Sequence, residues 1–197
     1  MASTKKAYND LEFLNSPEAR TIRMLCEYEE PRKRLEAQGI ENTIVFFGSA
    51  RSVSPEEARE QLVAAEAAAE AQPGDAELQR ALDKAQKGIR LSGFYDDARE
   101  LARRLTEWDL ARPQARGYTV STGGGPGMME AANRGASEVP GGRSVGLGIS
   151  LPFEEKVNTY VPDELAFEFH YFFMRKLWFL YHVKAMVLMP GGFGTMD

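Results

Sequence analysis

The sequence predicts a doubly wound, Rossmann-like α/β fold built on a parallel sheet. Runs of apolar and β-branched residues alternate along the chain with segments of helical periodicity, which favours parallel strands joined by right-handed crossovers. Three of these strands end in loops of glycine and other small residues, and such loops lie where parallel sheets bind ligands. The length of 197 residues and the 43% of hydrophobic residues suffice for a packed core.

We divide the chain into an N-terminal helical arm, residues 1–41, and a nucleotide-binding domain, residues 42–197, with an inserted helical hairpin at 54–90. The arm is polar and charged. A Ser-Pro signal predicts a helix from Ser16 to Gln38, which Pro31 could interrupt. We interpret this arm as a packing element.

The inserted hairpin follows the first predicted strand. Ser54-Pro55 opens a helix rich in alanine and glutamate that runs to Ala71, residues 72–75 form a turn, and a second helix runs to about Lys87. Its stripe of alanine and leucine predicts a packing face for the partner helix or for another subunit. A further helix over about 93–112 completes the first crossover. Three of its residues are expected to face the sheet: Tyr95, Leu101 and Leu105.

The first predicted strand begins at Asn42 and is rich in β-branched and aromatic residues. It ends in Gly48 and Ser49, which would lie on the rim formed by the carboxyl ends of the strands. Arg51 follows and could neutralise a phosphate there. A solvated arginine is the simpler interpretation, so we rank Arg51 below Ser49.

A second strand at 118–122 leads into a run of glycines and then a helix to Ala136. Three consecutive glycines cost conformational entropy, so close approach of the backbone to a ligand explains them better than a simple turn. Glu130 falls in the first helical turn, where it serves either the helix dipole or a ribose hydroxyl or water. The predicted ligand-binding residues of this loop are Gly123, Gly124, Gly125, Gly127 and Met128.

Further strands are predicted at 144–151 and 167–172, separated by a loop that includes 157–162. The second of these strands enters a helix that carries the basic pair Arg175 and Lys176. We expect this helix to be buried, because its apolar residues at 173, 177 and 180 share one helical face.

The last predicted strand, 183–189, is mostly apolar and is expected to be a buried parallel strand. The loop after it permits positive φ and close approach of an anion to backbone N–H groups, with a threonine hydroxyl as a further donor. A tight turn between strand and helix is the alternative. The predicted phosphate-binding residues of this loop are Gly191, Gly192, Gly194 and Thr195.

Four motifs now occur in one order: F-G-S-A-R at 47–51, T-G-G-G-P-G-M-M-E-A-A-N-R-G-A at 122–136, M-R-K at 174–176 and P-G-G-F-G-T at 190–195. Together they resemble the LOG family, which consists of Rossmann-like phosphoribohydrolases acting on nucleoside 5′-monophosphates and includes cytokinin-activating enzymes. Members of that family were long labelled "lysine decarboxylase". The resemblance covers about residues 40–197.

The resemblance implies hydrolysis of the N-glycosidic bond of AMP, or of an N6-substituted relative, to the free base and ribose 5-phosphate. It implies no metal or redox cofactor. Arg175 would be a catalytic residue in contact with substrate, Glu130 would hold ribose hydroxyls or assist the water, and Lys176 would assist binding. The glycine loops and Ser49 would hold the 5′-phosphate.

The family signature P-G-G-x-G-T-x-x-E places a catalytic glutamate one position after Asp197, which itself occupies an x. We therefore expect a helix to open at that glutamate and a further strand and helix to follow. The 197-residue chain by itself should hold a nucleotide better than it cleaves one. The family's paired subunits imply a homodimer or higher homo-oligomer. The aromatic helix 171–181 would be its surface or, alternatively, part of one subunit's core.

Two other classes of function remain at this point. A non-catalytic carrier of a nucleotide or phosphate ligand would keep the glycine loops without needing Arg175. A decarboxylase dependent on pyridoxal phosphate would need a Schiff-base lysine with a supporting acid, and neither Lys176 nor Lys184 shows that pattern.

Composition limits which ligands and cellular locations we expect for this protein. The net charge of −5 gives no electrostatic footprint for nucleic acid. Cys26, His170 and His182 have no recognisable metal-binding spacing. There is no signal peptide or 18-residue apolar run, so we expect a cytoplasmic protein that binds a small ligand and no membrane.

Overall fold

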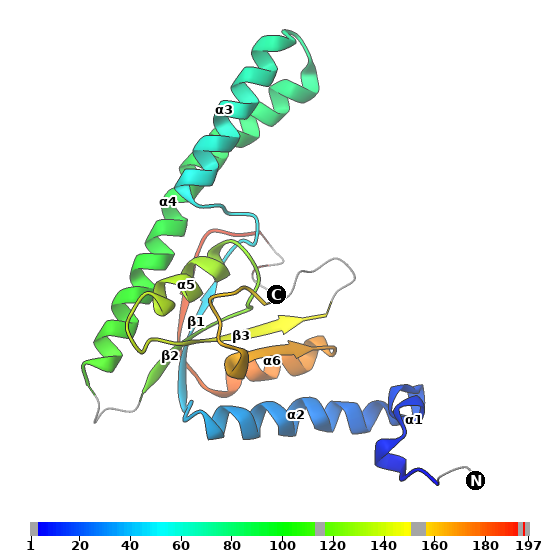
Figure 1. The fold of residues 1–197 in the computed structure, drawn as a ribbon. Helices are drawn as coiled ribbons and strands as arrows, with labels where there is room; N and C mark the ends of the chain where they lie inside the picture. The colour runs from blue at the N-terminus through cyan, green and yellow to red at the C-terminus, as the bar shows by residue number, and fades with distance from the viewer. Residues whose placement is uncertain (1–3, 113–116, 151–156, 193–194, 196–197) are drawn as a thin grey trace.

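The computed structural model describes residues 4–112, 117–150, 157–192 and 195. Its core is a five-stranded, all-parallel sheet with strand order β4-β3-β2-β1-β5 (Figure 1). Helices cover both faces, which confirms the predicted doubly wound α/β fold. The strands are β1 (Asn42–Phe47), β2 (Tyr118–Thr122), β3 (Ser144–Ile149), β4 (Ala166–Phe169) and β5 (Val183–Leu188).

Each face of the sheet is covered by two helices of the described part of the chain. Helices α2 (Arg20–Ala37) and α6 (Phe172–Tyr181) pack on one face, where Val45 of β1 is fully buried. Helices α4 (Ala76–Leu110) and α5 (Met128–Ser137) pack on the other face. Because side chains alternate along a strand, neighbouring residues of β1 belong to different cores. The remaining short helices are η1 (Ala7–Asn9), α1 (Leu11–Asn15), η2 (Pro17–Ala19) and η3 (Asp163–Leu165).

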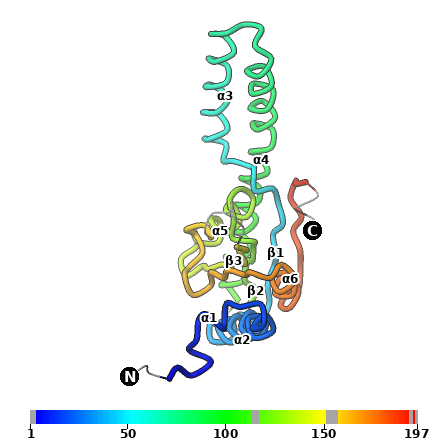
Figure 2. Tube along the Cα trace, turned by 90° about the vertical axis from the view of Figure 1, so that its right-hand side faces the viewer, coloured from blue at the N-terminus to red at the C-terminus, as the bar shows by residue number. Residues whose placement is uncertain are grey.

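Helix α3 (Pro55–Ala71) pairs with the first half of α4 to form a hairpin that projects away from the sheet (Figures 1 and 2). The predicted break between Lys87 and Gly93 is wrong, because α4 is one helix of 35 residues. Its first half packs on α3 and its second half packs on α5 and β2. Packing along its whole length therefore keeps α4 continuous despite its two glycines. None of the described helices is long and apolar enough to cross a bilayer.

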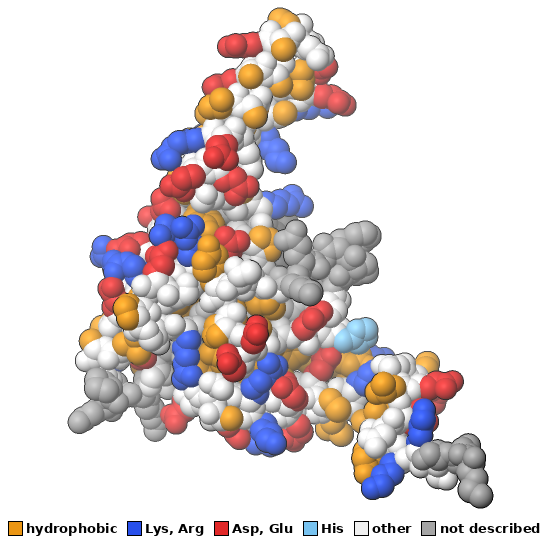
Figure 3. Space-filling model, viewed as in Figure 1, with side chains coloured by type: hydrophobic (Ala, Val, Ile, Leu, Met, Phe, Trp, Pro, Cys, Tyr) orange, Lys and Arg blue, Asp and Glu red, His pale blue; other side chains and the backbone are white. Residues whose placement is uncertain are grey.

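The expected sheet-facing residues of α4 are only partly correct. Tyr95 is buried and Leu105 packs against the core, but Leu101 is 38% exposed. The outer surface of the projecting hairpin carries hydrophobic side chains among charged ones, and Val63 is 65% exposed (Figure 3).

The N-terminal helix α2 is continuous through Pro31, so the interruption that Pro31 could have caused does not occur. A 3-10 turn beginning at Pro17 precedes the helix. Towards its C-terminal end, the guanidinium of Arg34 lies 3.8 Å from the centroid of the Phe167 ring in β4. This cation–π contact and the buried Leu35 fasten the arm to the sheet.

Strand β5 and helix α6 are less buried than the sequence predicts. The expected buried strand at 183–189 lies at an edge of the sheet, and Leu188 is 61% exposed. The prediction that residues 173, 177 and 180 form the buried face of α6 is also wrong, since Phe173, Leu177 and Leu180 are all exposed. Apolar content alone did not show which neighbours each element has. The buried residues of α6 are Met174, Trp178 and Phe179.

The crossing of α4 and α5 depends on Gly135, where an added Cβ would collide with the carbonyl oxygen of Arg99. We predict that Gly135→Ala lowers the free energy of unfolding by about 1 to 3 kcal/mol or more, because neither backbone can yield without separating the helices. Denaturant titration measures this loss. The matched control is Gly93→Ala in α4, where a Cβ meets nothing within 4 Å. The control should stabilise the protein by about 0.5 to 1 kcal/mol, and equal stability of both variants would contradict the prediction.

Candidate active site

The loops that follow β1, β2 and β5 are hydrogen-bonded to one another at the carboxyl end of the sheet. The amide of Ser49 donates to the carbonyl oxygen of Pro190 at 3.1 Å. The carbonyl oxygen of Ser49 accepts from the amide of Met128, also at 3.1 Å. The side-chain oxygen of Ser49 accepts from the Arg51 amide at 3.1 Å and holds its own turn. One residue therefore joins the three loops that the sequence identified.

Sterics require glycine in the loop after β2. Gly124 and Gly127 both have φ of +72°, which favours glycine, and a Cβ on Gly127 would collide with the Ser49 carbonyl oxygen. A Cβ on Gly123 would lie 2.5 Å from a terminal nitrogen of Arg175 and 2.7 Å from the sulfur of Met129. The loop is thus covered closely by two side chains, of which the sequence singled out only Arg175.

Arg175 extends from α6 to strand β3 and to the loop after β2. Its Nε donates to the carbonyl oxygen of Leu147 in β3 at 2.6 Å, and Nη2 lies 3.4 Å from the carbonyl oxygen of Gly123. Its guanidinium lies 5.3 Å from the centroid of the Phe179 ring. This half-buried cation is held against the glycine loop. Lys176 has a different neighbour, with its ammonium 4.8 Å from the centroid of the Phe172 ring.

Met128 serves the packing of the site. Its side chain is buried against Gly48, where any Cβ would collide with it. Its amide is already bonded to Ser49. The contact between β1 and α5 at this point needs a residue without a side chain, which explains the glycine before Ser49.

A buried polar network lies behind the glycine loop, and sequence reasoning did not identify it. Thr122 and Asn133 are both fully buried, and the Thr122 hydroxyl donates to Asn133 Oδ1 at 2.7 Å. Asn133 Nδ2 donates to the hydroxyl of Ser144 at 2.9 Å. Asn158 completes the network, with its Nδ2 2.9 Å from Asn133 Oδ1. Its four residues are far apart in the sequence, so no local pattern reveals it.

Glu130 faces helix α4. Its Oε1 accepts a hydrogen bond of 3.0 Å from the hydroxyl of Tyr95. Burial, together with the negative charge of Glu130, raises the pKa of Tyr95 from its ordinary value of 10.0 to about 12. Tyr95 therefore remains a protonated donor at neutral pH and fixes the direction of the carboxylate.

The loop after β5 folds back on itself. The amide of Thr195 donates to the carbonyl oxygen of Gly192 at 3.0 Å, and a Cβ on Gly191 would collide with the Thr195 side chain. Gly191 and Gly192 are exposed. The fourth predicted residue of this loop, Gly194, lies outside the described residues.

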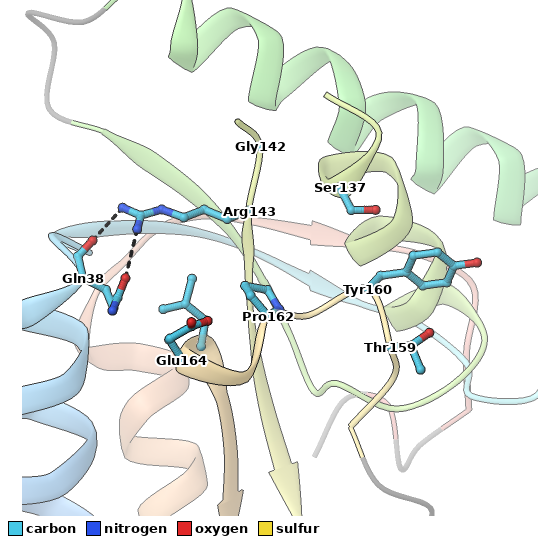
Figure 4. A pocket seen from close by; sticks show the side chains of 9 residues that line it. Gln38, Ser137, Gly142, Arg143, Thr159, Tyr160, Pro162 and Glu164 are labelled. Carbon is cyan, nitrogen blue, oxygen red and sulfur yellow. Dashed lines mark hydrogen bonds between the residues drawn. The ribbon is translucent and has the colours of Figure 1, made fainter. Parts of the chain in front are cut away.

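A cavity of about 510 Å³ lies away from the glycine loops, between the ends of α2 and α5 and the start of β3 (Figure 4). Arg143 in its wall donates to the backbone and side-chain oxygens of Gln38 at 2.6 and 3.3 Å. None of the predicted site residues lines this cavity. The described residues also contain no group of three or more His, Cys, Asp or Glu side chains that could hold a metal ion.

These observations define an α/β protein of Rossmann-like topology with a glycine-loop site at the carboxyl ends of its strands. Residues 129–197 match the family model described as "Possible lysine decarboxylase". That description is the older label of the LOG family, so the match supports the resemblance to the LOG family found in the motifs. The matched segment includes Arg175 and the loop after β5, but neither Ser49 nor the glycines of the β2 loop. A search of curated proteins found no match.

Tyr95 gives a test of this local geometry. Because its pKa is raised in the folded state, the stability that it contributes is complete below pH 10 and is lost as the pH rises through about 12. We predict that Tyr95→Phe shows a smaller loss of unfolding free energy between pH 10 and 12 than the parent protein. Its absorbance titration should also lack the late phenolate step. The control Tyr8→Phe removes an exposed tyrosine and should keep that step; loss of the step in the control would refute the assignment.

Proposed function

We propose that the protein is a nucleoside 5′-monophosphate phosphoribohydrolase. Its reaction would hydrolyse the N-glycosidic bond of AMP, or of an N6-substituted relative, to the free base and ribose 5-phosphate. The observation that carries the proposal is the contact of Arg175 with the glycine loop after β2, beside a rim of three joined loops. The family match supports it.

The proposed reaction has two electrostatic requirements. Cleavage of the bond develops positive charge on the ribose, as an oxocarbenium-like species, and negative charge on the departing base. A carboxylate stabilises the first charge and a cation offsets the second. Arg175 is a cation that the fold holds at the glycine loop. Glu130, whose carboxylate is fixed in the first turn of α5, would hold ribose hydroxyls or assist the water. In the family signature a further glutamate follows the position of Asp197.

The loops would anchor the 5′-phosphate. The N-terminus of α5 and the glycine amides supply fixed positive dipoles, which attract a phosphate without any side-chain charge. The phosphate-binding role extends to Ser49, Lys176, the β2-loop residues 123–125 and 127–128, and the β5-loop residues 191, 192, 194 and 195. Anchoring the phosphate would place the glycosidic bond at one position beside Arg175.

The test is incubation of the protein, as its gene encodes it, with AMP, followed by chromatography for adenine. We expect adenine and ribose 5-phosphate in equal amounts. Arg175→Gln should lower kcat by about 100- to 1,000-fold, the range seen when one preorganised electrostatic group is removed. The matched control is Lys184→Gln, which removes a lysine from the exposed edge strand and should leave the rate unchanged.

Tight AMP binding without adenine release would instead favour a non-catalytic nucleotide carrier. Release at the parent rate by a folded Arg175→Gln variant would show that Arg175 is not catalytic. The decarboxylase in the family description needs a Schiff-base lysine. Lys176 lies beside the Phe172 ring and Lys184 is on the sheet edge, so incubation with pyridoxal phosphate should give no absorbance band of a lysine adduct.

We also propose that the protein forms a homodimer through the exposed apolar side of α6. Phe173, Leu177 and Leu180 are 47%, 38% and 60% exposed. Met186 and Leu188 of β5 are exposed beside Val45 and Phe47, on the face of the sheet that α6 covers. Exposed apolar side chains gathered on one element are typical of protein interfaces.

Light scattering coupled to size-exclusion chromatography tests the dimer. Leu180→Glu should convert a dimer to a monomer, because it places a charge among the exposed apolar side chains of α6. Leu91→Glu, on the exposed side of α4, is the matched control and should leave the mass unchanged. A parent protein that is monomeric at micromolar concentration would end this proposal.

A further inference from the structure

We propose that Asn158 is a positioning residue that orients the peptide group between Gly124 and Gly125 in the β2 loop so that the Gly125 N–H faces the anion. The inference rests on the proposed binding of a phosphate at this loop. It assigns to Asn158 no contact with the substrate.

Asn158 reaches the loop from a segment that follows β3. Its side-chain nitrogen lies 3.0 Å from the carbonyl oxygen of Gly124 and 3.1 Å from that of Gly125. Its backbone amide also donates to the Gly124 carbonyl oxygen, at 2.7 Å. Two successive carbonyl groups of the glycine loop are thus held by one residue 33 and 34 positions further along the chain.

The direction of these carbonyl groups determines what the loop can bind. In a planar trans peptide, the C=O of one residue points opposite to the N–H of the next. Since Asn158 holds the carbonyl of Gly124, the N–H of Gly125 points to the opposite side of the loop. No acceptor for that N–H is found among the described residues. With this peptide group reversed, the loop would present the Gly124 carbonyl oxygen to a phosphate and repel it.

The neighbouring peptide groups of the loop are also fixed, but they offer no N–H to an anion, because the Gly124 N–H is bonded within the protein and Pro126 has none. The carbonyl of Gly123 faces Arg175, and the amide of Gly124 correspondingly donates to the Thr122 hydroxyl at 2.9 Å. The side chains of Asn158 and Arg175 thus hold three successive carbonyl groups of the loop. Glycine alone would leave these orientations undetermined, because it samples many backbone conformations.

The amide of Asn158 is itself fixed in one orientation. Its Oδ1 accepts from the backbone amide of Tyr160 at 3.2 Å, so its nitrogen must face the glycine loop. That nitrogen shares its two hydrogens among two carbonyl oxygens and the Oδ1 of Asn133. Asn133 is fully buried and is bonded in turn to Thr122 and Ser144. Such a satisfied buried network has one arrangement, and that arrangement sets the loop.

The contacts of Asn158 predict a different loss of anion affinity for each substitution at this position. Asn158→Ala removes the side-chain donors but keeps the backbone bond to Gly124. Asn158→Asp has nearly the same shape, yet it places carboxylate oxygens against two carbonyl oxygens and adds a negative charge near the bound anion. Asn158→Gln keeps the donors. Thr159→Ala alters the next residue, which lines the separate cavity and, in the described part of the chain, makes no hydrogen bond to the loop.

The experiment measures binding of AMP and inorganic phosphate by calorimetry, with kcat and KM for AMP. We expect Asn158→Ala to raise the Kd for both ligands by about 10-fold, corresponding to about 1.4 kcal/mol. Asn158→Asp should raise it further. Asn158→Gln should recover part of the affinity, and Thr159→Ala should bind as the parent does. Because the phosphate is held in both ground and transition states, KM should rise more than kcat falls.

A second measurement does not depend on whether the variants fold. In NMR spectra of the parent protein, phosphate should shift the amide proton resonance of Gly125. The resonance of the exposed Gly93 should not shift. An unshifted Gly125 resonance at saturating phosphate would overturn the inference, as would parent-like Kd values in folded Asn158→Ala and Asn158→Asp. The parent protein could bind phosphate yet release no adenine, with substitution of Asn158 abolishing that binding. In that case the hydrolase proposal fails and the positioning role stands.

Discussion

The backbone hydrogen bonds of Ser49 hold the candidate site together. The amide of this residue is bonded to the loop after β5 and its carbonyl to the start of α5. Both bonds use main-chain atoms, so their geometry comes from the path of the chain after β1. That path is possible because Gly48 admits the side chain of Met128. Three loops remote in sequence therefore share one rim.

The N-terminal arm contributes to this site indirectly, through α6. The carboxylate of Glu27 accepts from the backbone amides of His170 and Tyr171, at 2.8 and 3.2 Å, just before α6 begins. The indole of Trp178 donates to the carbonyl oxygen of Glu27 at 2.9 Å. These contacts fix the helix that carries Arg175. The arm is thus packed against the element that supplies the proposed catalytic cation.

The sequence predicted the strands and glycine loops well, because apolar runs and glycines are local signals. Residues 42, 118, 144 and 183 each begin a strand, as expected. Local signals failed where neighbours decide the outcome. Gly88 and Gly93 do not break α4, because packing along both halves outweighs their helix propensity. Pro31 likewise lies within a continuous helix.

Residue types and their order identified the parallel sheet, its glycine-lined rim and the family resemblance, because strand period, glycine sterics and motif spacing are properties of short segments. The sequence did not predict how far β5 and α6 are buried, because burial depends on the neighbours that each element has in the fold. Strand β5, for example, lies at an edge of the described sheet and has a neighbouring strand on one side only. The contact of Asn158 with Gly124 joins residues 34 positions apart, and that of Arg175 with Gly123 spans 52. Such contacts exist only once the sheet has brought separate loops to the same edge.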